Sequence, residues 1–197
     1  MDKIIAKMLY NRKEHKKFYM FHLFRRSLTL YFMLGLLILL GALTVANVIK
    51  GESVTFSIIM FGITMGIVPY LIISRINEVV KQETPKRIKS TDTVEVTKHK
   101  ITRSNDVITG KATIGWNELD CVCENKDYIF MYTADNSGLF IKKDCIVEGD
   151  LELFRKIALA NLPNDKKGRK RYFRYGKIRK EYKKARKQEK KLAKIKK

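Results

Sequence analysis

The sequence predicts a membrane-anchored protein, in which an α-helical hairpin of two transmembrane helices carries a small α+β cytosolic domain. In that domain we expect an antiparallel β-sheet closed by a C-terminal helix. Three observations predict this fold class: two long uncharged apolar stretches, a later series of short β-prone runs, and a strongly basic end of the chain. They divide the sequence into a cytosolic segment (1–27), two spans (28–49 and 54–74), a helical linker (75–90), a β-domain (91–163) and a tail (164–197).

The two spans are Leu28–Ile49 and Val54–Ser74, and neither contains a charged residue. A helix rises 1.5 Å per residue, so the first span reaches about 33 Å and can cross a bilayer core of about 30 Å. A soluble protein with two buried helices is disfavoured, because neither stretch has a polar face to show water. A cleavable signal peptide is also disfavoured, because the second span follows at once.

Basic residues flank the spans on their outer sides, whereas the loop 50–53 between them is electrically neutral. The positive-inside rule therefore predicts a multi-pass protein with both termini in the cytoplasm. Inside the second span, Gly62 and Gly66 form a Gly-x-x-x-Gly pair, a spacing that lets helix backbones approach closely. Packing within the hairpin is the first interpretation of this pair, and homodimerisation is the alternative.

The segments on either side of the spans are expected to be mainly helical. A short strand within Lys3–Tyr10 precedes a juxtamembrane helix over Arg12–Ser27, for which Asn11 is the predicted N-cap, with Glu14 completing a capping box. After the second span the helix should continue to about Glu83, where Thr84-Pro85 stops it.

The β-domain alternates short β-prone runs with polar turns, which predicts an antiparallel meander. Trp116 is expected to pack at a corner of the sheet. Asp150 should cap a helix that ends near Asn161 and has one apolar face, formed by Leu151, Phe154, Ile157 and Ala158. The expected strands are Thr91–Thr97, Ile101–Ser104, Val107–Ile114, Leu119–Glu124, Tyr128–Thr133 and Gly138–Lys142.

One pattern in this domain resembles a known family. The residues are Ile114-x-Trp116-x-x-Leu119-x-x-Val122-x-Glu124-x-Lys126-Asp127-Tyr128-Ile129-Phe130, then Phe140-Ile141 and the helix end Ala160-Asn161-Leu162. This pattern looks like the YcxB-like family of bacterial membrane proteins, which have two predicted spans and a C-terminal domain similar to the bacterial pleckstrin-homology-like (PH-like) fold. The resemblance implies a PH-like sheet and a place in the bacterial cell (inner) membrane. It carries over no functional residues, and the chain departs from the family's usual Ile-Pro-Lys at Ile141-Lys142-Lys143.

Few residues are candidates for metal binding or catalysis. Cys121 and Cys123 are two apart on an expected strand, so they should share one face, together with Leu119. Val122 then points to the opposite face, so either both faces of the strand are covered or a bulge intervenes. A zinc site would also need Cys145 and His99, and the usual Cys-x₂₋₄-Cys loop spacing is absent. We therefore expect the two cysteines to act as small apolar strand residues. The sequence shows no phosphate loop, paired-acid motif or other catalytic signature, and it predicts no enzyme, metal or cofactor.

The tail holds most of the positive charge. The chain has a net charge of +21, and residues 165–197 carry eighteen Lys or Arg against three acids. Tyr175, Ile178, Tyr182, Ala185 and Leu192 recur at helical spacing, which gives a narrow apolar stripe on a cationic helix. The residues predicted to contact anionic lipid or nucleic acid are Arg169, Lys170, Arg171, Arg174, Lys177, Arg179, Lys180, Lys183, Lys184, Arg186 and Lys187.

These features support three functional hypotheses. The first is a non-catalytic bacterial membrane protein whose PH-like domain docks a protein or a lipid headgroup and whose polybasic tail lies on anionic membrane. The second is an adaptor that tethers RNA or the ribosome to the membrane through the tail. The third is an accessory subunit of a membrane enzyme or transporter, although no ionisable residue lies in the spans to form a proton relay or an ion pathway.

Overall fold

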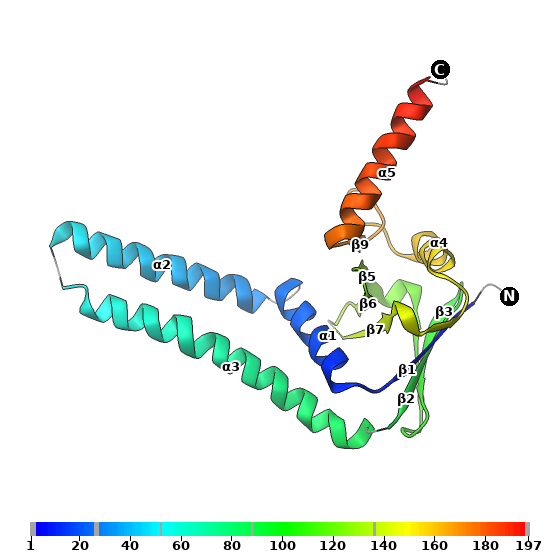
Figure 1. Ribbon diagram of the computed structural model, residues 1–197, viewed down its shortest axis with the longest axis horizontal. Coiled ribbons are helices and arrows are strands. Elements are labelled where there is room, and N and C mark those ends of the chain that lie inside the picture. Colours follow the sequence, from blue (N-terminus) through cyan, green and yellow to red (C-terminus); the bar gives the residue numbers. More distant parts are fainter. Residues whose placement is uncertain (1–2, 26–27, 52, 88, 136, 196–197) are drawn as a thin grey trace. The chain divides into compact units, whose positions relative to one another are not determined.

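The computed structural model describes residues 3–25, 28–51, 53–87, 89–135 and 137–195. The chain divides into two compact units, which we call the helical unit (Asn11–Ile88) and the β unit (Met1–Tyr10 with Lys89–Lys197). Figure 1 labels their elements. The N-terminal segment therefore belongs to the β unit, although the whole helical unit lies between this segment and the rest of the β unit in the sequence.

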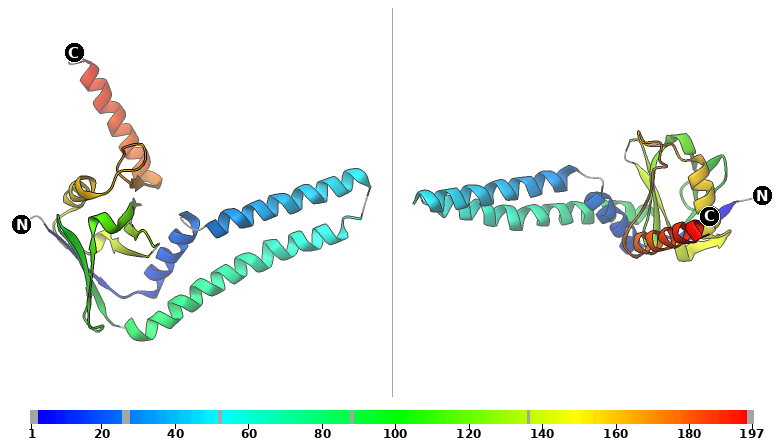
Figure 2. Two further views of the ribbon diagram at one scale, coloured as in Figure 1. Left: turned by 180° about the vertical axis from the view of Figure 1, so that it is seen from behind. Right: turned by 90° about the horizontal axis from the view of Figure 1, so that it is seen from above.

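The helical unit contains α1 (Arg12–Arg25), α2 (Leu28–Lys50) and α3 (Thr55–Arg87). Asn11 begins α1 as predicted, because its Oδ1 accepts a hydrogen bond from the Lys13 amide at 2.9 Å. Helices α2 and α3 run side by side in opposite directions in both views of Figure 2. Near the turn between them, Asn47 Nδ2 donates to Ser57 Oγ across the hairpin at 3.2 Å.

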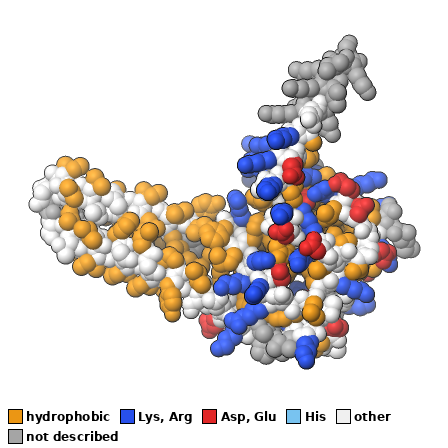
Figure 3. Space-filling model, in the orientation of Figure 1, with side chains coloured by type: hydrophobic (Ala, Val, Ile, Leu, Met, Phe, Trp, Pro, Cys, Tyr) orange, Lys and Arg blue, Asp and Glu red, His pale blue; other side chains and the backbone are white. Residues whose placement is uncertain are grey.

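Both long helices are apolar enough to cross a membrane, by length and composition alone: Leu30–Lys50 and Thr55–Gln82 meet that criterion. Their surface is rich in hydrophobic side chains in Figure 3. The predicted end of the second long helix is wrong, since α3 continues through Pro85 to Arg87. Proline removes the hydrogen bond of its own nitrogen and its ring crowds the carbonyl four residues earlier, and the helix ends two residues after it.

The described part of the β unit contains two sheets where the sequence predicted one. The first has the strand order β4-β3-β2-β1-β8 and the second the order β7-β6-β5-β9. A 3₁₀ turn, η1 (Trp116–Glu118), separates β4 from β5 and takes the chain from one sheet to the other. The first sheet comprises β1 (Ile4–Leu9), β2 (Thr91–Val96), β3 (Lys100–Asn105), β4 (Lys111–Gly115) and β8 (Ile146–Glu148). The second comprises β5 (Leu119–Glu124), β6 (Tyr128–Thr133), β7 (Gly138–Lys142) and β9 (Tyr172–Arg174).

Strand pairing explains how the N-terminus joins the β unit. Strand β1 lies antiparallel to β2, in a register from Ile4 opposite Val96 to Leu9 opposite Thr91. Strand β4 begins later than predicted, because Asn105 Oδ1 accepts the amides of Val107 and Ile108 and holds them in a turn. Among the described strands, every pair is antiparallel except β5 with β9, which is parallel.

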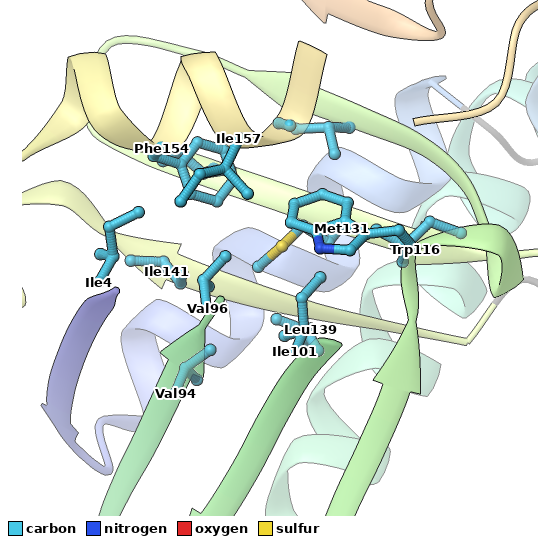
Figure 4. Packing of buried hydrophobic residues seen from close by; sticks show 14 of the residues in the cluster. Ile4, Val94, Val96, Ile101, Trp116, Met131, Leu139, Ile141, Phe154 and Ile157 are labelled. Carbon is cyan, nitrogen blue, oxygen red and sulfur yellow. The ribbon is translucent and has the colours of Figure 1, made fainter. Parts of the chain in front are cut away.

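The core draws side chains from both sheets and from α4 (Leu151–Asn161). Figure 4 shows Phe154 and Ile157 of α4 beside Met131 and Ile141, with Val94 and Ile101 of the first sheet. Asp150 caps α4 as predicted, by accepting the Leu153 amide at 2.7 Å. Trp116 is only 4% exposed, and its Nε1 donates to the Thr97 carbonyl at 2.9 Å. The predicted corner position of this tryptophan is thereby confirmed.

Candidate functional site: the Glu124 cluster and the cationic helix

The predicted tail divides into two parts. The first part extends to Arg174 and adds a strand to the second sheet, because β9 pairs with β5 from Tyr172 opposite Val122 to Arg174 opposite Glu124. The second part is α5 (Gly176–Ile195). The sequence suggested a helical tail but gave no sign of the strand before it.

Three cations that we predicted as ligand contacts make intramolecular bonds before β9. The Arg169 guanidinium donates to Asp165 Oδ2 at 2.9 and 3.0 Å, and Arg171 pairs with Asp120. Lys170 Nζ donates to the carbonyl of Leu162 at 2.6 Å, just beyond the C-terminal end of α4. Positive charge near the end of a helix interacts favourably with its last carbonyls, so Lys170 stabilises α4.

The side chain of Glu124, at the end of β5, is fully buried and has polar partners from several elements. Its Oε1 accepts from Lys143 Nζ at 2.7 Å and from Arg155 Nη2 at 2.5 Å. Its Oε2 accepts from Tyr172 Oη at 2.9 Å and from Arg155 Nε at 3.2 Å. Arg174 Nε lies 3.7 Å from the same Oε2. These five residues form what we call the Glu124 cluster, and it joins β5, the turn after β7, α4 and β9.

The cluster sets the ionisation of its members. Burial raises the pKa of Glu124, but the hydrogen bonds from Arg155, Lys143 and Tyr172 outweigh burial and lower it to about 2. Burial and the neighbouring Glu124 charge raise the pKa of the Tyr172 hydroxyl well above its ordinary value. Glu124 is therefore a charged acceptor and Tyr172 a neutral donor at neutral pH. Because both carboxylate oxygens are occupied, this arrangement is suited to holding elements together.

Arg174 links the cluster to α5. Its guanidinium lies over the ring of Tyr172 at 4.8 Å and over the ring of Tyr182, in α5, at 4.1 Å from the ring centroid. Both distances are within the range of cation–π attraction. The Tyr175 amide also donates to the Glu124 carbonyl at 2.9 Å. The junction between β9 and α5 is thus bonded to β5 through backbone and side chain.

Helix α5 carries the remaining predicted contacts. Lys177, Arg179, Lys180, Lys183 and Lys184 are exposed, and Figure 3 shows Lys and Arg side chains along this helix. We call these five residues the cationic face. Arg186 and Lys187 lie in α5, but their side chains are outside the described residues. In the apolar stripe, Ile178 is half-buried and Tyr182 lies under Arg174.

The cysteines lie on a different face of β5 from the one we predicted with Leu119. A register shift between Leu119 and Cys121 places two β5 residues against one of β6, and Leu119 and Val122 enter the core while Cys121 and Cys123 do not. Such a bulge reverses the alternation of the strand. Both thiols are buried and neither is part of a disulfide, and their sulfur atoms are 3.9 Å apart. Within the described residues, no group of three His, Cys, Asp or Glu side chains could hold a metal.

Gly62 and Gly66 do not lie at the packed face of the hairpin. A Cβ at either position would meet no atom within 4 Å, and both residues are exposed. Ser57 and Thr64 are the buried polar residues in this part of α3. The structure therefore gives no support to packing of α2 on the glycine pair.

Glu124 is the functional candidate that sequence reasoning missed. A carboxylate at the end of the otherwise mostly apolar run LDCVCE was the available signal, since charged side chains are seldom fully buried unless paired. Its partners Lys143, Arg155 and Tyr172 are 19 to 48 positions away, so no local pattern joins them.

Comparison with known proteins supports the resemblance drawn from the sequence. Residues 101–158 match the model of a family described as YcxB-like protein. The matched region runs from β3 into α4, and it contains Glu124, Lys143 and Arg155 of the cluster. The curated proteins and the solved structures gave no match to this chain.

Proposed function

We propose that this chain is a non-catalytic bacterial membrane protein whose helix α5 binds anionic lipid. In this proposal α2 and α3 anchor the chain in the cell membrane, with both termini in the cytoplasm. The β unit is a PH-like module that docks a protein or a lipid headgroup. The observation that carries the proposal is the cationic face of α5, in a chain that also has two helices apolar enough to span a bilayer.

Charge arithmetic favours a lipid surface as the ligand. Each Lys or Arg near an anionic bilayer contributes on the order of 1 kcal/mol, so the five residues of the cationic face supply a strong attraction even after screening by salt. RNA offers the same phosphate chemistry. However, a chain tethered to a membrane meets lipid at a high effective concentration, whereas RNA must reach it by diffusion.

The chemistry of the β unit supports a binding role over a catalytic one. Glu124 is its most strongly engaged acid, and Lys143, Arg155 and Tyr172 occupy both of its oxygens. A carboxylate held ionised in this way cannot serve as a general base near neutral pH, because its pKa of about 2 makes it a weak proton acceptor. Two sheets around a core that includes α4 are the basis for the PH-like assignment.

The test uses the full chain in nanodiscs of neutral lipid, mixed with anionic vesicles, neutral vesicles or RNA at a series of matched salt concentrations. We expect capture of anionic vesicles only, with capture declining as salt rises. Equal capture of neutral vesicles, or preference for RNA at matched salt, would overturn the lipid assignment.

A charge variant and a matched control locate the binding surface. Replacing Lys177, Arg179, Lys180, Lys183 and Lys184 with Gln keeps good helix formers and should weaken capture by about a hundredfold. The control removes five exposed lysines elsewhere in the β unit, by Gln at Lys98, Lys100, Lys111, Lys126 and Lys156. If the control weakens capture as much as the α5 variant, net charge is responsible and not α5.

A further inference from the structure

We infer that Glu124 is a positioning residue for α5, because it fixes strand β9 and thereby the direction in which the cationic helix leaves the second sheet. The inference rests on the proposed function only for the ligand of α5. A polybasic tail is usually taken as a flexible chain that adapts to its surface. The contacts around Glu124 indicate instead a helix that is attached at its base before any ligand arrives.

The first step is the attachment of β9. This strand has only three residues, and it lies at the edge of the second sheet. Backbone pairing over so short a length is weak, since isolated short strands have few hydrogen bonds to offset their ordering. Glu124 adds one side-chain bond to the strand and one backbone bond just after it: Tyr172 Oη donates to its carboxylate at 2.9 Å, and the Tyr175 amide donates to its carbonyl at 2.9 Å.

The second step is the transfer of position from β9 to α5. Arg174 follows Tyr172 by two residues, and its Nε lies 3.7 Å from the Glu124 carboxylate. The same guanidinium lies 4.1 Å from the ring centroid of Tyr182, two turns into α5. The Glu124 carboxylate therefore holds the Arg174 guanidinium, which in turn contacts α5 at Tyr182. Between Arg174 and Tyr182, the φ of +62° at Gly176 marks the turn into α5.

The consequence is that α5 presents one defined face. Because Tyr182 lies under Arg174, the apolar stripe of α5 faces the junction in the first turns of the helix. The cationic face lies away from this stripe. Arg174 is then a structural residue of the junction, although we predicted it as a ligand contact. The helix meets an anionic surface already ordered, which reduces the ordering entropy lost on binding.

The test is hydrogen exchange of the full chain in neutral-lipid nanodiscs, where no anionic ligand is present. Glu124→Gln preserves shape and removes the charge. We expect amides of Tyr175 and of residues 180–184 to exchange about tenfold faster, while amides of β6 stay protected. Glu152→Gln is the matched control, because Glu152 also pairs with Arg155 but its side chain is 80% exposed and has no bond to β9. Unchanged exchange in α5 of the Glu124 variant would overturn the inference.

A second variant decides the case in which Glu124→Gln destabilises the whole β unit and β6 also loses protection. Tyr172→Phe removes only the hydroxyl that donates to Glu124. Faster exchange confined to Tyr175 and residues 180–184 then supports the inference, and no change there contradicts it. Because neither measurement involves anionic lipid, α5 can be positioned by Glu124 even if the lipid proposal fails, and the two failures are distinguishable.

Discussion

At the scale of the residue, Glu124 joins four elements of the β unit through its buried carboxylate. A fully buried carboxylate is tolerated because three hydrogen-bonding side chains compensate for lost hydration. Removing such a partner leaves an uncompensated buried charge, so each member of the cluster depends on the others. The free energy of unfolding should therefore depend on pH through the ionisation of Glu124.

We predict that Glu124→Gln removes the part of the pH-dependent stability that Glu124 contributes. The pKa of Glu124 falls from 4.5 to about 2 on folding, so its contribution is fully present above pH 4.5 and is lost as the pH falls towards 2. The full contribution is about 3 kcal/mol, from the shift of the pKa between the two states. Trp116 is the chain's only tryptophan and lies in the core, so denaturant unfolding followed by its fluorescence reports on the β unit.

That measurement compares the full chain and the variant at pH 7, 4 and 3. The difference in unfolding free energy between them should shrink as the pH falls. A difference that stays constant from pH 7 to 3 would contradict the assigned pKa.

Gly149 gives a second prediction at this scale. Its φ is +78°, and a Cβ there would lie 2.8 Å from the Lys3 carbonyl oxygen and 2.9 Å from Ile4 Cγ1. Gly149→Ala should therefore reduce stability by about 2 to 4 kcal/mol, from the left-handed backbone and the clash with β1 together. Gly168→Ala is the control, because its φ of +70° is similar but its surroundings are open. Equal losses in both variants would show that the approach to β1 does not matter.

Sequence reasoning succeeded at residues whose role is local. Trp116 at a corner and Asp150 at a helix start were predicted because neighbouring residues define those positions. Glu124 was not, because its role comes from side chains that only the fold brings together. The face of Cys121 was mispredicted for a related reason: one bulge inverts the alternation on which the prediction depended.

At the scale of the element, the strands and helices with strong periodicity were predicted well. The buried strand β6 and the amphipathic helix α4 have their expected bounds. Strands β8 and β9 have three residues each, too few for any periodicity to appear. The basic composition of Arg169–Arg174 further disguised β9, because Lys and Arg runs usually indicate solvated chain.

Helix α3 offers a prediction that separates the two interpretations of its glycine pair. Gly62→Ala with Gly66→Ala should leave the hairpin intact and raise helix stability slightly, because alanine favours helix and meets no atom within 4 Å. Thermal unfolding by circular dichroism in detergent measures this, with Thr64→Leu as the contrasting change at a buried position. A marked loss of stability in the double alanine variant would restore the interpretation of packing within the hairpin.

Light scattering of the same double variant addresses the homodimer. If the detergent-solubilised chain is dimeric and the variant is monomeric, the glycines lie at the contact between copies. If both are dimeric, the glycine pair is not that contact.

At the scale of the whole molecule, the distribution of charge and apolar surface connects the fold to the proposed role. Two apolar helices, a β unit with internally paired charges and a helix with a cationic face lie on one chain. The sequence predicted this order of parts because composition changes sharply between them. It could not predict that β1 pairs with β2, because more than eighty residues separate the two strands.

The family match covers residues 101–158, so β1, β2, β9 and α5 lie outside it. The part shared with the family therefore contains most of the core and the Glu124 cation partners Lys143 and Arg155. The part outside it contains the cationic face. The proposed lipid contact is thus a property of this chain's own C-terminal helix.

The most direct test of the central claim is whether the lipid of the nanodisc that holds the chain protects α5 from a protease. Trypsin cleaves after Lys and Arg, so the full chain in anionic and in neutral nanodiscs can be compared by the rate of cleavage in α5. The exposed turn Lys98–Lys100 serves as the internal reference for protease access. We predict cleavage in α5 about tenfold slower in anionic discs relative to that turn, because bound helix is not available to the protease. Equal relative rates in the two lipids would contradict the claim that α5 binds anionic membrane.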